Sequence, residues 1–139
     1  MMQMPEDKTF IDTNILLYLL SEDANKADRA EKILRSGGII SVQVLNEIAN
    51  VTRRKLAMSW MEINEFLLLI RSLCLVKPLN AETHDKGIRI AERYKLSVYD
   101  AMIAAAGLLG GCNILYSEDM QDGLLIENHL RVCNPFTTY

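Results

Sequence analysis

Apolar residues in this chain form short runs that alternate with longer stretches of helical period. The short runs are bounded by Gly, Asn, Asp, Ser or Pro, as the strands of a sheet are. The longer stretches follow Ser, Asn or Asp, the residues that cap the first turn of a helix. We therefore predict strands at residues 9–11, 39–40, 75–79, 113–116 and 131–133, and helices at residues 15–20, 27–35, 41–56, 59–73, 80–94 and 97–110.

Strands that alternate with helices in this way are typical of a parallel sheet covered on both faces. No repeat, linker or charged block divides the sequence, so we expect residues 1–139 to form one α/β domain. Its central, mostly parallel sheet should have about five strands flanked by helices. Pro78 lacks a ladder donor and predicts an edge strand at 75–79. The helix after Ser97 is apolar on all sides and belongs in the middle of the domain.

Composition indicates a packed globular protein in a reducing compartment. Half of the residues are hydrophobic and 24% are charged, which excludes disordered and collagen-like chains. Cys74, Cys112 and Cys133 have no CxxC spacing, so we expect buried thiols instead of disulfides or a zinc site. Residues 1–8 lack the features of a signal peptide, and no apolar stretch is long enough for a membrane span. We therefore expect a cytoplasmic protein with no membrane partner.

Three aspartates occupy positions that the predicted sheet brings together. Asp12 follows the first strand and Asp119 follows the strand at 113–116, so both carboxylates emerge at one edge if these strands are neighbours. Asp100 is the only charged residue of the apolar helix at 97–110. An unpaired charge is costly to bury, so its turn should open onto water, a cation or a basic partner.

Each aspartate also has a purely structural interpretation. Asp12 is equally consistent with an N-cap of the following helix, and Asp119 with an ordinary turn residue. Asp100 is three residues after Ser97, the spacing of a capping box. These alternatives remain open from the sequence alone.

Glu47 lies in the helix predicted at 41–56, and its position can be projected at 100° per residue. Ile48 and Val51 project close to it, so Glu47 borders the buried stripe. A glutamate on a solvated helix face is the usual alternative, but such a residue would more often lie opposite the core. Asn50 and Arg54 form a polar strip beside it that is available to a substrate.

Four carboxylates that converge without basic partners repel one another, and a divalent cation neutralises them most simply. All-oxygen ligands favour Mg²⁺ or Mn²⁺ over zinc. Such a site polarises a phosphoryl oxygen and activates water, which predicts phosphodiester hydrolysis. The net charge of −3, from 15 Lys and Arg against 18 Asp and Glu, by itself argues against a nucleic-acid partner. Two divalent ions change the balance to +1 (−3 + 4), so binding of RNA should depend on the metal.

Five segments, in this order, resemble the PIN-domain ribonucleases, and within them the VapC-like toxins of bacterial toxin–antitoxin pairs. They are Phe10-Ile11-Asp12-Thr13-Asn14, Ser41-Val42-Gln43-Val44-Leu45-Asn46-Glu47, Leu96-Ser97-Val98-Tyr99-Asp100-Ala101, Leu115-Tyr116-Ser117-Glu118-Asp119 and Asn134-Pro135-Phe136. The resemblance covers essentially the whole chain.

The resemblance implies that the metal-binding catalytic acids are Asp12, Glu47, Asp100 and Asp119. It also implies a PIN-like domain with Mg²⁺- or Mn²⁺-dependent endoribonuclease activity, a homodimer, and a small antitoxin that inhibits it. Asn14 and Ser117 would be polar supports of the site.

The last acidic motif departs from the common family pattern Thr-x-Asp-x-Asp-Phe. Ser117 keeps the hydroxyl, but Gln121 occupies the place of the second acid and Asp122 lies one residue further on. Whether Asp122 supports the metal directly or through water stays open at this stage.

The densest basic run is Arg53-Arg54-Lys55, which is suited to contact RNA phosphates or simply to end a helix. Trp60 favours packing or a dimer face over base stacking. A non-catalytic RNA- or protein-binding module is the alternative function, although the retention of all four acids argues against it. A phosphotransfer domain ranks below it, because the chain has neither an Asp-x-Asp nucleophile motif nor a P-loop.

Overall fold

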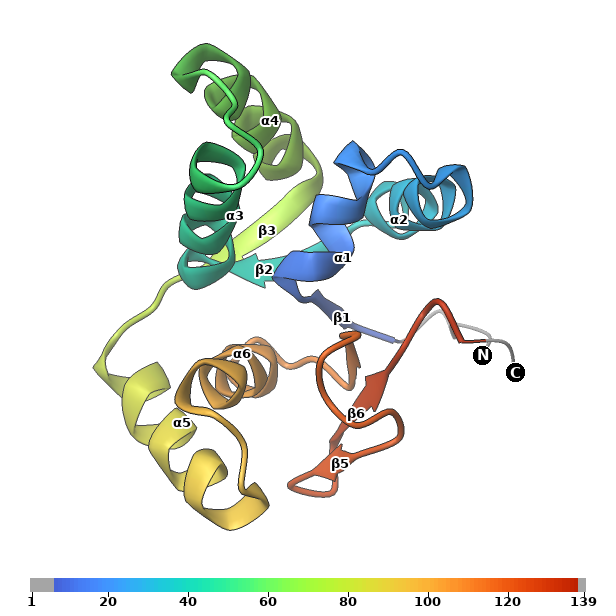
Figure 1. The fold of residues 1–139 in the computed structure, drawn as a ribbon. Helices are drawn as coiled ribbons and strands as arrows, with labels where there is room; N and C mark the ends of the chain where they lie inside the picture. Colours follow the sequence, from blue (N-terminus) through green and yellow to red (C-terminus); the bar gives the residue numbers. More distant parts are fainter. Residues whose placement is uncertain (1–6, 138–139) are drawn as a thin grey trace.

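The computed structural model describes residues 7–137, so residues 1–6, where we expect no signal peptide, lie outside the described part. Strands and helices alternate along the chain as the sequence predicts (Figure 1). The strands are β1 Thr9–Ile11, β2 Gly38–Ser41, β3 Cys74–Lys77, β4 Ile114–Tyr116, β5 Leu125–Ile126 and β6 Leu130–Cys133. The helices are α1 Thr13–Leu17, the 3-10 turn η1 Tyr18–Leu20, α2 Ala24–Arg35, α3 Val42–Arg54, α4 Trp60–Leu73, α5 Ala81–Tyr94 and α6 Val98–Leu109.

The strands form one sheet in the order β3-β2-β1-β4-β6-β5. All neighbours are parallel except β5 and β6, so the predicted mostly parallel sheet is confirmed. β3 is the edge strand that Pro78 predicts, and it ends at Lys77, directly before the proline. The order reverses next to β1, because β2 and β4 lie on opposite sides of it. Such a reversal opens a crevice at the carboxyl ends of the two diverging strands.

Helices cover the sheet on both faces, with α5 and α6 on one face and α1 to α4 on the other (Figure 1). α6 is the central helix, since its residues from Ala101 to Gly107 are all buried. It packs closely against α5 at Gly87, where a Cβ atom would lie 2.5 Å from Sδ of Met102. This close approach packs the N-terminal half of α6 tightly against α5.

The sheet has six strands, one more than the expected five. The additional strand, β5, has only two residues and pairs antiparallel with β6. Their connection is a tight turn in which Glu127 and Asn128 have φ of 52° and 54° and the N–H of His129 donates to the carbonyl of Ile126. Asn128 is of a type that tolerates positive φ, but Glu127 is not, and the turn lacks the glycine that usually marks such hairpins.

Two helices begin earlier than the sequence predicts. Asp12 caps α1, which therefore starts at Thr13 and tightens into η1 at its end. The start of α2 was predicted at residue 27, but Asp23 accepts hydrogen bonds from the amides of Asn25 and Lys26 and begins the helix three residues sooner. In both cases an aspartate that precedes the apolar pattern decides the boundary.

The three cysteines are buried thiols, as predicted. Burial raises the pKa of Cys74 and of Cys112 to about 11, so these thiols are inert core side chains. Within residues 7–137, no helix combines the length and the apolar character that crossing a membrane requires.

Candidate active site

Asp12 stands at the point where the strand order reverses, and the register of β1 against β4 places it there. Ile11 pairs with Tyr116, so the next residues along, Asp12 and Ser117, lie side by side. The Ser117 hydroxyl donates to Oδ2 of Asp12 at 2.9 Å, and the amide of Thr13 donates to Oδ1 at 2.7 Å. Asp12 is thus the N-cap of α1, as the structural interpretation holds, and one of its oxygens also faces the end of β4.

The carboxyl group of Asp12 is almost fully buried, with 4% of its residue surface exposed. This desolvation raises its pKa to about 6, against the opposing effect of its hydrogen bonds to Ser117 and Thr13. The charges of Asp119 and Glu47 raise the pKa further, which shows that these carboxylates are near neighbours. Asp12 is therefore an acid that lacks the positive charge its ionised form requires.

The bond from Ser117 can be tested by titration. Because this hydroxyl stabilises the ionised form of Asp12, Ser117→Ala should move the pKa of the Asp12 carboxyl further upward from its value of about 6. Carboxyl-carbon NMR of the metal-free protein measures both values, with Ser72→Ala, a serine on α4, as the matched control. An unchanged or lowered pKa in Ser117→Ala would contradict the assigned hydrogen bond.

Glu47 reaches the same edge of the sheet from the second turn of α3. Its Oε2 accepts from the Thr13 hydroxyl at 3.1 Å, which links α3 directly to the residue after Asp12. Its Oε1 accepts from Nε2 of Gln43 at 2.9 Å. Glu47 is only partly buried, as expected for a position that borders the buried stripe. The two bonds hold its carboxylate toward Asp12.

Asp119 and Asp100 complete the group from the other side of the crevice. Nδ2 of Asn14 donates to Oδ2 of Asp119, and the amide of Asp119 donates to the Ser117 hydroxyl at 3.2 Å. Desolvation raises the pKa of Asp119, and the negative charge of Asp100 raises it further. The two carboxylates are therefore close enough to repel each other. The structure therefore brings all four predicted acids to one edge, with Asn14 and Ser117 between them.

Asp100 does not act as the acid of a capping box. The Ser97 hydroxyl accepts from the Asp100 amide at 3.1 Å, but the reciprocal bond from the carboxylate is not made, in contrast to the complete capping box of Ser59 and Glu62. Across the described residues, the Asp100 carboxylate has neither a hydrogen bond nor an ion pair. Its side chain is therefore free to bind a ligand in the crevice.

The donor set fits a hard divalent cation. All four side chains offer oxygen atoms, and no Lys, Arg or His among residues 7–137 forms an ion pair with any of them. Ser41, at the carboxyl end of β2, adds a buried hydroxyl without a partner. Within the described part of the chain, no three His, Cys, Asp or Glu side chains are placed to hold a metal ion together.

The remaining predicted residues lie around this group. The Asp122 carboxylate accepts from the amide of Asn134, so it joins the loop after β4 to the end of β6. Arg53 donates to the carbonyl of Met58 and lies 4.9 Å from the ring centroid of Trp60, which places it in the turn between α3 and α4. Arg54 and Lys55 follow it at the exposed end of α3. Their contact with RNA stays a prediction.

Sequence reasoning missed two residues that position Glu47. Gln43 precedes it by four residues, a helical spacing at which side chains meet, so this contact was accessible from the pattern. Thr13 gave no such signal, because its bond to Glu47 spans 34 positions. The sequence also did not predict the cluster at Glu118, the residue before Asp119. There Lys26 and the Tyr18 hydroxyl donate hydrogen bonds to the carboxylate of Glu118.

A mostly parallel sheet with carboxylates at the reversal of strand order defines an α/β protein with an acidic site at its topological switch point. Residues 9–121 match the family model of the PIN domain, which spans all four acids. The chain belongs to the PIN domain family.

Solved structures share this fold at low sequence identity. A chain of a toxin–antitoxin complex from Klebsiella pneumoniae superposes with a TM-score of 0.72 at 19% identity, covering 94% of this chain and 100% of that one. VapC20 of Mycobacterium tuberculosis, a sarcin-ricin loop cleaving toxin, gives 0.66 at 19% identity over 81% of this chain and 90% of its own. VapBC2 of Rickettsia felis, bound to a DNA fragment from its promoter, gives 0.64 at 17% identity over 89% and 96%. Comparison with curated proteins finds no match in sequence.

Proposed function

We propose that the protein is an endoribonuclease that requires Mg²⁺ or Mn²⁺ and hydrolyses RNA phosphodiester bonds. The observation that carries this proposal is the group of four carboxylates at the switch point, with Asp12 buried and no basic side chain of the described residues paired with any of them. Such a group is unfavourable without a cation, and a cation there gives it a chemical function.

Asp12, Asp100 and Asp119 would hold the metal, while Glu47 would complete its shell or orient the attacking water. When bound, the metal would polarise a phosphoryl oxygen and make water a stronger nucleophile. Ser117 and Asn14 would keep Asp12 and Asp119 in place through the hydrogen bonds described above. The supporting role of Asp122 would then be indirect, through the loop that it fastens to Asn134.

The proposal extends to the role of a toxin in a toxin–antitoxin pair. Structures of a toxin–antitoxin complex and of VapBC proteins are similar in fold over most of their length. We propose a small antitoxin as a partner, a second copy of the chain in a homodimer, and the cytoplasm as the place of action.

Exposed apolar side chains on α4, such as Met61 and Leu68, offer surface for a protein partner. A homodimer would have twice the 15.8 kDa mass of one chain in solution.

Induced expression of the wild type and of Asp100→Asn in bacterial cells tests the toxic activity. The wild type should arrest growth and generate new RNA ends, whereas Asp100→Asn should do neither, because a ligand of the metal is lost while the fold is retained. Co-expression of a short reading frame adjacent to the gene should restore growth if it encodes the antitoxin. Growth arrest and new RNA ends with both proteins, or with neither, would contradict catalysis at this site.

A further inference from the structure

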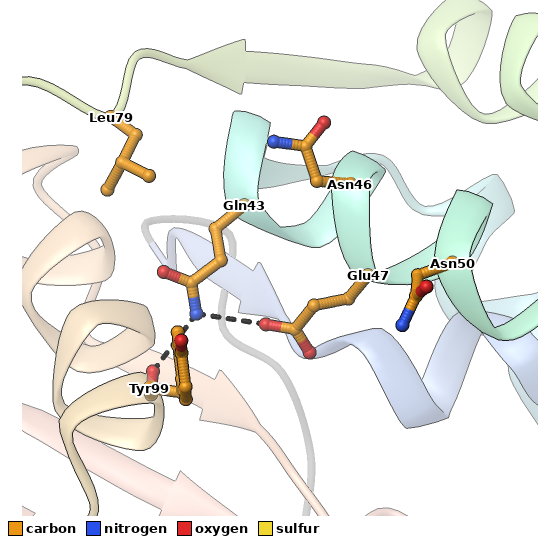
Figure 2. A pocket seen from close by; sticks show the side chains of 6 residues that line it. All are labelled: Gln43, Asn46, Glu47, Asn50, Leu79 and Tyr99. Carbon is orange, nitrogen blue, oxygen red and sulfur yellow. Dashed lines mark hydrogen bonds between the residues drawn. The ribbon is translucent and has the colours of Figure 1, made fainter.

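A pocket of about 550 Å³ lies beside Glu47, between α3 and the N-terminal turn of α6. Figure 2 shows its side chains: four project from α3, one comes from α6 and one from the loop after β3. The lining residues are Gln43, Asn46, Glu47, Asn50, Leu79 and Tyr99. Its volume is that of a site for a small molecule or for one unit of a polymer. Glu47 lines the pocket and is also one of the four acids, so the pocket adjoins the acidic group.

The chemistry of the lining is amide and aromatic. Asn46 and Asn50 lie one helical turn apart on α3, both are exposed, and neither side chain has a hydrogen-bond partner in the described part of the chain. Tyr99 is 72% exposed, an unusual degree for an aromatic ring, and its hydroxyl is equally free. Leu79 adds an apolar wall. Free amides and an exposed ring are the groups that bind the edge and the face of a nucleobase.

Among residues 7–137, no lysine or arginine lines this pocket. A phosphate group would find there only the carboxylate of Glu47, which repels it, so the pocket does not suit the backbone of RNA. A neutral base carries donors and acceptors on its edge and a polarisable face, and it meets no unfavourable charge in contact with Asn46, Asn50 and Tyr99. The lining therefore favours a base over a phosphate.

Gln43 connects the pocket to the acidic group. Its side chain is buried, and Nε2 donates both to Oε1 of Glu47 at 2.9 Å and to the carbonyl of Tyr99 at 3.2 Å. Both bonds are drawn in Figure 2. The backbone of Tyr99 is thereby tied to the carboxylate of Glu47, so the pocket and the acidic group share one hydrogen-bonded network.

We propose that this pocket is a nucleobase subsite, in which one base of the RNA stacks on Tyr99 and its edge is read by the amides of Asn46 and Asn50. The inference rests on the proposed function, since it names the part of the RNA substrate next to the scissile phosphate. It gives the enzyme a base preference at one position. A peptide segment of a protein partner is the competing occupant, and the experiment below separates the two.

Nucleotide binding tests the subsite without any catalysis. Metal-free protein in EDTA is titrated with AMP, GMP, CMP and UMP, and the side-chain amide signals of Asn46 and Asn50 are followed by NMR. At least one nucleotide should shift them, and inorganic phosphate should not. Tyr99→Ala should weaken this binding about tenfold, whereas Tyr99→Phe should retain it because the ring is kept. Val98→Ala, an exposed neighbour in the same turn, is the control.

Cleavage supplies the second measurement. With a randomised RNA and Mg²⁺, the wild type should prefer one base at a fixed position from the cut, and Asn46→Ala with Asn50→Ala should reduce that preference. If the wild type binds nucleotides at these amides but cleaves nothing, the proposed function fails and the subsite stands. If the nucleotides leave both amides unshifted, or if Tyr99→Ala binds as the wild type does, the subsite is wrong, whether or not RNA is cleaved; a peptide-binding pocket would give this result.

Discussion

Asp12→Asn is expected to reduce RNA cleavage by the purified protein roughly a thousandfold at saturating Mg²⁺, which corresponds to about 4 kcal/mol of lost stabilisation of the transition state. Asparagine has nearly the same shape and keeps an oxygen for the amide of Thr13. It loses the negative charge that would hold the cation. The initial rate of cleavage of a labelled RNA measures the effect.

Asp85→Asn, the same chemical change at an exposed position on α5, is the matched control and should cleave as the wild type does. Circular dichroism of both variants shows that the fold is kept. Cleavage by Asp12→Asn within a few fold of the wild-type rate would mean that the buried carboxylate does not take part in the reaction.

The same substitution should stabilise the metal-free protein at neutral pH. The pKa of Asp12 is about 6 in the folded state, against 3.8 for an unperturbed aspartate, so ionisation of the folded protein at pH 7 is unfavourable. This raised pKa corresponds to about 3 kcal/mol, the upper limit of the gain in unfolding free energy for Asp12→Asn.

The sign of the pH dependence follows from the raised pKa. Between pH 4 and 6 the folded state binds more protons at Asp12 than the unfolded state does, so this group makes the wild type less stable as the pH rises. The advantage of Asp12→Asn should therefore be small near pH 4, grow up to about pH 6 and stay constant above it. Urea unfolding in EDTA at several pH values measures it.

Mg²⁺ should reverse the order of the two proteins, because a cation that binds the folded wild type stabilises it by mass action and has less affinity for the variant. Asp85→Asn should respond to pH and Mg²⁺ as the wild type does. A lower stability of Asp12→Asn in EDTA at pH 7 would contradict the description of Asp12 as an acid without a positive partner.

The sequence was sufficient to predict the position of those site residues that follow the ends of strands. Asp12 and Asp119 each follow a short apolar run, and in a parallel sheet the carboxyl ends of neighbouring strands share one edge. The helical projection of Glu47 was informative for the same reason, since a regular period carries over into space. Asp100 was identified from its isolation in an apolar helix, and its carboxylate is indeed without a partner among the described residues.

Features that depend on long-range side-chain contacts were not accessible in this way. The bond from Thr13 to Glu47 depends on how α1 packs against α3, which no local pattern encodes. The hairpin of β5 and β6 depends on two residues with positive φ, Glu127 and Asn128, and glutamate does not indicate that conformation. The exposure of Tyr99 likewise became visible only when the first turn of α6 was placed against α3.

The most direct test of the account is the dependence of RNA cleavage on the metal. Purified wild-type protein is incubated with a labelled RNA in EDTA, then with added Mg²⁺ or Mn²⁺, and the chemical ends of the products are identified. We predict cleavage only in the presence of the metal, with linear phosphate and hydroxyl ends, because water is the nucleophile. Equal cleavage in EDTA, or products that end in a 2′,3′-cyclic phosphate, would contradict a metal-dependent hydrolytic site at Asp12, Glu47, Asp100 and Asp119.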